Sequence, residues 1–178
     1  MILLSFGEKA LIFVAIVVVL IGYFAISNVL KKKKALSEVK QTLIEIAGES
    51  SVVKVDSKVY DFEMDYNNKK FLIKMIYHPS RNEININSKS YWQVNEGSVS
   101  SRKSGVQMQG VYDLVNFDLA SNGYNKSDTV KLYVIYPSSR VLLKVINECE
   151  MEFIKPETDI YGCKVNNFTD LKENINKF

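Results

Sequence analysis

The sequence predicts an N-terminal transmembrane helix followed by one α/β (α+β) domain built on a mixed sheet. Residues 10–30 contain no Asp, Glu, Lys, Arg, His or Pro. Beyond Gly48 the apolar residues change from helical to alternating spacing, and strand-like runs then alternate with helix-like runs. The resulting order is helix, several strands, helix, strand, helix, strand, helix, which is typical of a mixed sheet covered by helices.

The first element is the apolar segment at residues 10–30. A hydrocarbon core about 30 Å thick needs about 20 apolar helical residues, and this segment has that length. Glu8 and Lys9 nearly cancel before it. Four lysines follow it: Lys31, Lys32, Lys33 and Lys34. The positive-inside rule therefore places the following domain in the cytoplasm. A cleaved signal peptide is the alternative, but the charge follows the apolar run and no A-x-A-like site comes after it.

These features divide the chain into an anchor with a basic collar at residues 1–34 and a cytoplasmic domain at residues 35–178. The collar lysines are expected at the membrane surface, where anionic head groups lie. The four collar lysines carry more positive charge than the net charge of +3 of the whole chain, so the domain itself is near neutral or slightly acidic. This charge argues against a broad nucleic-acid-binding surface. Cys149 and Cys163 have the spacing of neither a zinc site nor a redox pair, and we expect two buried, reduced thiols.

Helical spacing continues directly after the collar. A helix is predicted at residues 35–47, and Gly48 is a natural residue to end it. Four apolar residues form its stripe: Leu36, Val39, Leu43 and Ile46. The stripe packs on the domain or faces a partner as a coil, and the helix either continues the membrane span or is separate from it.

The alternating part begins with a short strand at residues 52–55 and a hairpin of residues 60–66 and 69–77 around an Asn-Asn turn. Alternation places one set of side chains on one face: Tyr60, Phe62, Met64 and Tyr66. The other face carries three carboxylates: Asp61, Glu63 and Asp65. Three carboxylates suit a divalent metal ion, but a two-residue turn sets Asp61 opposite Lys74 and Asp65 opposite Lys70. A solvated face of cross-strand ion pairs is the favoured interpretation.

The remaining elements follow from local spacing. His78 begins a turn at residues 78–82 and is predicted to be a surface residue rather than a general base. Trp92 is predicted to be a core residue rather than a platform for a nucleic-acid base. The other predicted elements are, in chain order, strands at 83–87 and 90–94, a polar loop at 97–105, a helix at 106–120, a loop at 121–128, a buried central strand at 129–136, a helix at 139–147, a strand at 159–166 and a helix at 169–175 with Thr169 as N-cap.

Over residues 36–175 this order resembles the nuclease-related domain, a branch of the PD-(D/E)xK restriction-endonuclease-like fold. In that branch an opening helix precedes a hairpin with an Asp on its first strand and Glu-x-Lys on its second. A Trp-containing strand, a helix, a central strand and terminal αβ elements follow. Asp61 matches the first acid, whereas Lys74-Met75-Ile76 stands in place of Glu-x-Lys.

The resemblance implies a degenerate site, because the ammonium of Lys74 stands where the second metal ligand belongs and Ile76 replaces the lysine. Asp61, Glu63 and Lys74 are then vestigial, and no catalytic residue, metal or cofactor is expected. The chain is expected to be a membrane-tethered pseudo-nuclease-like domain, embedded in the bilayer through residues 10–30. It would act as a binding or assembly module for a protein partner, with nucleic acid as the weaker candidate.

The alternative is an active, Mg²⁺-dependent nuclease with a relocated site. In that hypothesis Glu63, Asp65 or Glu83 holds the metal ion, and Lys70 or Lys74 supplies the base.

Overall fold

The computed structural model describes residues 6–57, 59–78, 83–89, 91–95, 106–107, 128–147 and 149–178. Contacts divide the chain into two compact units, residues 1–37 and 38–178. The boundary falls inside helix α1 (Phe6–Ala47), so residues 38–47 of this helix belong to the second unit. Three predicted segments lie outside the described residues: the turn at 78–82 except for His78, the loop at 97–105, and the loop at 121–128 except for Asp128.

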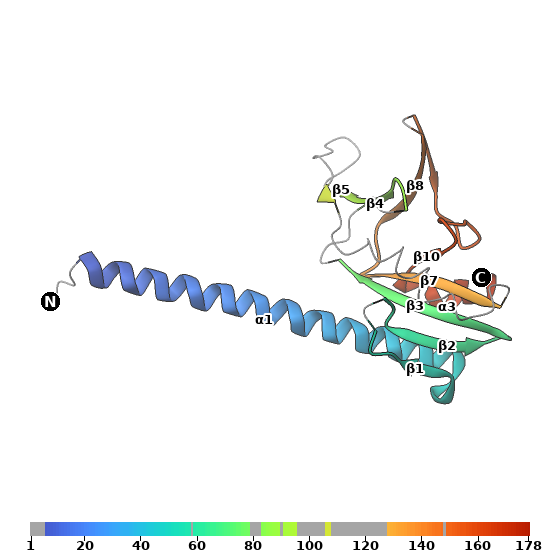
Figure 1. The fold of residues 1–178 in the computed structure, drawn as a ribbon, viewed down its shortest axis with the longest axis horizontal. Coiled ribbons are helices and arrows are strands. Elements are labelled where there is room, and N and C mark those ends of the chain that lie inside the picture. The colour runs from blue at the N-terminus through green and yellow to red at the C-terminus, as the bar shows by residue number, and fades with distance from the viewer. Residues whose placement is uncertain are drawn as a thin grey trace. The chain divides into compact units, whose positions relative to one another are not determined.

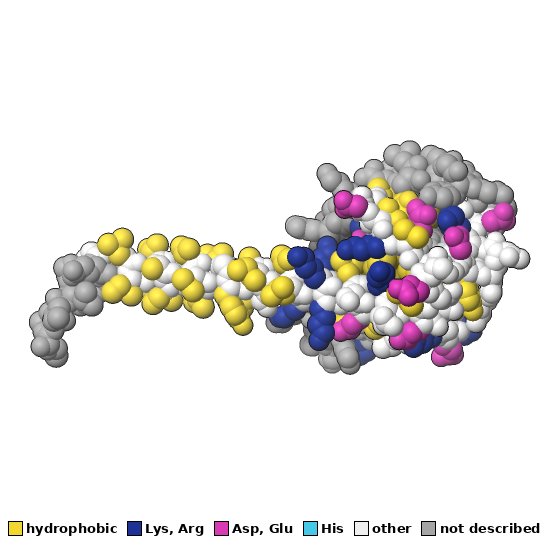
Figure 2. Space-filling model, turned by 90° about the horizontal axis from the view of Figure 1, so that it is seen from below, with side chains coloured by type: hydrophobic (Ala, Val, Ile, Leu, Met, Phe, Trp, Pro, Cys, Tyr) yellow, Lys and Arg dark blue, Asp and Glu magenta, His cyan; other side chains and the backbone are white. Residues whose placement is uncertain are grey.

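Helix α1 is continuous, so the apolar segment and the predicted helix at 35–47 are one element. No proline interrupts residues 6–47, and the helix ends before Gly48, whose φ of 88° suits glycine. Nearly all large apolar side chains in residues 11–30 are exposed, and Figure 2 shows them along the extended part of the helix. By length and composition this helix can cross a membrane, a property that signal sequences share.

The first sheet contains five strands in the order β1-β2-β3-β7-β10. The strands are β1 (Val52–Lys54), β2 (Phe62–Tyr66), β3 (Lys69–Tyr77), β7 (Thr129–Tyr136) and β10 (Lys164–Asn167). The first three are antiparallel neighbours, whereas β7 runs parallel to both β3 and β10. Asn67 and Asn68 turn the β2–β3 hairpin with φ of 50° and 60°, as a type I′ turn requires. The predicted register is confirmed, with Phe62 opposite Ile73.

A second five-stranded sheet has the order β6-β5-β4-β8-β9. Its strands are β4 (Glu83–Ile86), β5 (Trp92–Asn95), β6 (Val106–Gln107), β8 (Val141–Asn147) and β9 (Glu150–Phe153). Strands β4 and β8 are parallel and the other pairs are antiparallel. The domain therefore has the predicted mixed-sheet α+β character, but with two mixed sheets where one was predicted (Figure 1).

The core of the second unit lies between these sheets. Leu72, Tyr133 and Ile135 of the first sheet meet Ile84 and Trp92 of the second, all at most 2% exposed. The Trp92 and Tyr133 rings lie 5.6 Å apart between centroids, so the prediction that Trp92 is a core residue is confirmed. On the other side of the first sheet lies the end of α1 (Figure 1), where Val39 and Leu43 are fully buried. The stripe of the predicted helix thus packs on the domain.

The prediction of a helix at 139–147 is wrong, because Val141–Asn147 is strand β8. Apolar residues at 141, 142, 145 and 146 match helical spacing as well as a half-buried strand. Pairing decides between the two: β8 lies between β4 and β9, which supply backbone hydrogen-bond partners on both sides. The β-branched Val141 and Val145 suit this strand.

Several smaller predictions are also corrected. The first two residues of the predicted helix at 106–120 form strand β6 (Val106–Gln107), and its residues 108–120 lie outside the described residues. Of the predicted strand at 159–166, only residues 164–166 are in a strand, namely β10 (Lys164–Asn167), which is preceded by an isolated bridge between Ile160 and Cys163. The expectation of two buried thiols is confirmed for Cys163 but not for Cys149, which is exposed in the turn between β8 and β9; neither forms a disulfide.

The predicted terminal helix is broken into short turns. They are η4 (Phe168–Asp170), α3 (Leu171–Asn174) and η5 (Ile175–Lys177). The N-cap position of α3 is Asp170 rather than Thr169, and its side chain caps nothing. The segment is held instead by burial of Leu171 and Ile175 and by an ion pair of Lys172 with Glu45 of α1, 2.5 Å between Nζ and Oε2. That lysine lowers the pKa of Glu45.

A second contact fixes α1 to the first sheet and generates a testable pH dependence. The hydroxyl of Tyr136 donates a hydrogen bond to Glu38, and chiefly this bond raises the pKa of Tyr136 to about 12. Because an unfolded tyrosine titrates near pH 10, the contribution of this bond is present below about pH 10 and lost as the pH rises toward 12. The stability advantage of the wild type over Tyr136→Phe should shrink over that window. Melting followed by Trp92 fluorescence measures it, and a pH-independent difference would contradict the assignment.

Candidate functional site

The two residues that the sequence placed at the centre of the site lie together. Asp61 directly precedes β2, and Lys74 lies on β3. The Lys74 ammonium is 3.6 Å from Oδ1 of Asp61, and each side chain is 20% exposed. The other oxygen, Oδ2, accepts the backbone N–H of Met75 at 2.8 Å. Both oxygens of Asp61 therefore have partners within the hairpin.

The remaining charges of the hairpin gather around Lys70. Its ammonium lies 3.1 Å from Asp65 and 3.5 Å from Glu63, and Glu63 also accepts the hydroxyl of Tyr60 at 2.8 Å. Burial opposes the charged form of Lys70, but the hydrogen bond and charge of Asp65, together with those of Glu63, outweigh it and raise the pKa of Lys70. The predicted cross-strand ion pairs are thus present: Asp61 with Lys74, and Asp65 with Lys70.

These ion pairs are not on an open face. Alternation along β3 places Lys70, Leu72 and Lys74 on the same side, and Leu72 belongs to the core between the two sheets. The second sheet therefore lies over the neighbourhood of Asp61, Glu63 and Lys74, and these side chains are only about one-fifth exposed. The predicted solvated face is half-buried at this end and open only toward the turn, where Asp65 is 67% exposed.

Glu83, the third acid of the relocated-site alternative, lies on the other sheet. It is 6% exposed at the start of β4 and accepts a hydrogen bond from the Asn95 side chain at 3.0 Å. Strand pairing places β4 beside β5 and β8, not beside the β2–β3 hairpin. Glu63, Asp65 and Lys70 are brought together, and Glu83 belongs to a different sheet.

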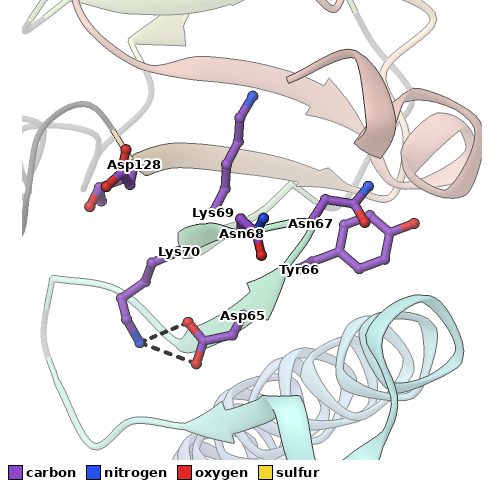
Figure 3. A pocket seen from close by; sticks show the side chains of 8 residues that line it. Asp65, Tyr66, Asn67, Asn68, Lys69, Lys70 and Asp128 are labelled. Atoms are coloured by element: carbon purple, nitrogen blue, oxygen red, sulfur yellow. Dashed lines mark hydrogen bonds and ion pairs between the residues drawn. The ribbon is translucent and has the colours of Figure 1, made fainter.

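A hollow in the described surface lies at the turn of the same hairpin, beside the ion pair of Asp65 with Lys70. It measures about 520 Å³ and is lined by the following residues: Asp65, Tyr66, Asn67, Asn68, Lys69, Lys70, Asp128 and Thr129. Figure 3 shows Lys70 reaching toward Asp65 while Lys69 points away. Lys69 donates to the main-chain oxygen of Phe178 at 2.6 Å. The hollow is open and mixed in charge, and Asp61 and Lys74 are not part of its lining.

Two contacts of this region were missed by sequence reasoning. Tyr60 was predicted on the face opposite Glu63, but β2 begins only at Phe62, so alternation does not extend back to Tyr60. Tyr60 is instead 8% exposed within the core between the sheets, with its hydroxyl on Glu63. The bond from the Met75 N–H to Asp61 has no signal in the residue types, because any residue at that position supplies the same donor.

The other predicted residues are not on the strands of the hairpin. Lys31, Lys32, Lys33 and Lys34 are exposed on α1. His78 is half-buried after β3, where its backbone N–H donates to the Tyr136 carbonyl at 2.7 Å. Within the described ranges, no group of three or more His, Cys, Asp or Glu side chains is placed to hold one metal ion.

No protein-family profile, curated protein or solved structure matches this chain.

The different surroundings of two neighbouring carboxylates give a test of this geometry. Asp61→Ala removes the acceptor of the Met75 N–H and a partner of Lys74 in a half-buried place, and we expect a loss of about 1–3 kcal/mol in unfolding free energy. Asp65→Ala removes an exposed ion pair and should cost less than about 1 kcal/mol. Urea unfolding followed by Trp92 fluorescence compares the two. Equal losses would show that Asp61 is as solvated as Asp65.

Proposed function

We propose that this chain is a membrane-tethered, pseudo-nuclease-like domain that serves as a binding or assembly module on the cytoplasmic face of the cell membrane. The observation that carries the proposal is the pairing of Asp61 with Lys74. In a nuclease of the family that the sequence resembles, this place would hold a metal ion between two acidic ligands. Here it holds an ammonium group.

The order of elements supports the resemblance. A helix precedes the antiparallel strands β1, β2 and β3, Asp61 stands just before β2, and Lys74 and Ile76 lie on β3. The Trp-containing strand β5 follows, and β7 then lies beside β3. The replacement of the expected helix at 139–147 by β8 is a departure, so the support comes from the opening helix, the hairpin and β7.

Electrostatics argues that the hairpin does not bind a catalytic cation. A divalent ion at Asp61 would lie beside the ammonium of Lys74, with which it has the same sign of charge, and would displace a hydrogen bond from Met75. The nearby carboxylates of Glu63 and Asp65 are held by Lys70. Metal-assisted hydrolysis needs carboxylates that converge on one ion, and each of these is paired with a lysine instead.

The tether supports a role at the membrane. The apolar part of α1 carries exposed apolar side chains, as a lipid-facing helix does, and the same helix continues to Ala47. The lysines at positions 31–34 follow the apolar part directly, which by the positive-inside rule favours a cytoplasmic domain.

The metal-free character of the site is tested by adding metal ions to the full-length protein in detergent. The wild type should neither cleave single- or double-stranded DNA with Mg²⁺ or Mn²⁺ nor melt at a higher temperature with them. Lys74→Glu should melt at a lower temperature than wild type without metal, since it opposes two carboxylates, and should regain stability with Mn²⁺ in proportion to RT ln(1 + [L]/Kd). If Mn²⁺ stabilises the wild type, and Asp61→Asn abolishes this gain, the active-nuclease alternative is correct.

The orientation is tested with a tag placed after Phe178. Protease added outside intact cells should leave this tag uncut, because the domain is expected on the cytoplasmic side. Loss of the tag while the membrane stays sealed would show the opposite orientation.

Changing all four collar lysines to Gln should disturb the orientation of the protein in the membrane while leaving its melting temperature unaltered.

A further inference from the structure

Strand β9 forms an open edge of the second sheet. It is the last strand in the order β6-β5-β4-β8-β9, and among the described residues no strand pairs with its outer side. All four of its residues are exposed. In Figure 1 the hairpin of β8 and β9 rises at the top of the picture, away from the first sheet. An open edge of this kind presents unpaired backbone donors and acceptors.

The register identifies which backbone groups face outward. The N–H of Ile154 donates to the carbonyl of Leu142 at 3.0 Å, so these two residues form a hydrogen-bonded pair. Hydrogen-bonded and non-hydrogen-bonded pairs alternate along an antiparallel ladder. Leu143 with Phe153 and Val145 with Met151 are therefore the non-bonded pairs. The N–H and C=O groups of Met151 and Phe153 consequently point to the open edge.

The side chains of β9 divide into two sets. Met151 and Phe153 share one face and are 43% and 68% exposed, an unusual exposure for large apolar residues on an edge strand. Glu150 and Glu152 share the other face, and Lys144 of β8 lies 3.8 Å from Glu152. The edge thus offers two outward backbone pairs, an apolar side and an acidic side.

We propose that β9 is the docking edge for an extended segment of a partner protein in which basic and apolar residues alternate. The segment would add to the second sheet as a sixth strand, bonding to the backbone of Met151 and Phe153. Its apolar side chains would cover Met151 and Phe153, and its lysines or arginines would face Glu150 and Glu152. This inference rests on the proposed function as a binding module and names its contact surface.

A second copy of this chain fits the edge poorly. Antiparallel pairing that brings Met151 opposite Phe153 of the copy also brings Glu152 opposite its own copy. The register centred on Met151 sets Glu150 opposite Glu152, and intermediate registers set carboxylates opposite apolar side chains. Like charges directly opposed destabilise a strand pair, so the acidic pattern favours a basic partner over self-pairing.

The probe is a fluorescent synthetic peptide of alternating Lys and Val, about eight residues long to cover the edge. Its fluorescence anisotropy is measured against the full-length protein in detergent. We expect saturable binding of the Lys-Val peptide, weaker binding of a Glu-Val peptide, and slower hydrogen exchange at the amide of Phe153.

Two variants test the contact. Met151→Pro removes one outward N–H donor, leaves the hydrogen bonds to β8 intact and should weaken binding of the Lys-Val peptide about tenfold. Glu150→Lys should weaken binding of the Lys-Val peptide and strengthen binding of the Glu-Val peptide.

The matched control is Lys54→Pro on β1, the edge strand of the first sheet. Val55 donates to the carbonyl of Asp61, so by the same alternation the N–H of Lys54 also points outward. This variant should bind the peptide like wild type. Trp92, the only tryptophan, is fully buried in the second sheet, and its fluorescence verifies that each variant is folded.

Three results would overturn the docking edge: no saturable binding of the Lys-Val peptide, unchanged binding by Met151→Pro, or dimerisation that Met151→Pro abolishes. Loss of peptide binding in Phe153→Ser but not in Met151→Pro would indicate that the peptide binds by apolar contact alone, and would equally reject strand addition. DNA cleavage by the wild type would reject the proposed function whatever the peptide does. A protein that neither cleaves DNA nor binds the peptide would reject only the edge.

Discussion

The parallel pairing of β3 with β7 is the constraint on which the domain depends. Parallel strands cannot be joined by a tight turn and need a long crossover. The connection from Tyr77 to Thr129 carries β4, β5 and β6, so it forms part of a second sheet. The second sheet also contains a parallel pair, β4 with β8, and the segment of chain that joins these two strands contains β7. The two sheets are therefore interleaved along the chain and share one core.

This arrangement determines the character of the charged hairpin. Lys70 and Lys74 flank Leu72 on the side of β3 that faces the second sheet, so the Asp61 ion pair lies at the margin of the core. A half-buried charge is tolerated there only because it is paired and hydrogen-bonded. The cover leaves the side chains of Asp61 and Lys74 each only 20% exposed.

The sheet edges differ in a way that matters for partners. Strand β1 is short and carries exposed Lys54, a common protection against unwanted strand addition. Strand β9 has carboxylates on one face but leaves Met151 and Phe153 exposed on the other. The acidic face disfavours pairing between copies, while the apolar face remains available.

Local chemistry in the sequence by itself determined the elements whose signals are short-range. Asn67-Asn68 and strict alternation around it predicted the hairpin, its register and the pairing of Asp61 with Lys74, because a two-residue turn leaves one register. The dense β-branched run at 129–136 predicted β7, and the uncharged segment at 10–30 predicted a helix able to cross a membrane.

Only the tertiary structure decided the identity of residues 141–147, the division into two sheets and the burial around Asp61. Val141, Leu142, Val145 and Ile146 fit a helix or a strand, and the choice depends on β4, which lies more than fifty residues earlier in the chain. Tyr60 turned to the core because β2 starts two residues later than the pattern indicated. Such outcomes depend on which distant strands supply hydrogen bonds and cover, and local spacing carries no record of those partners.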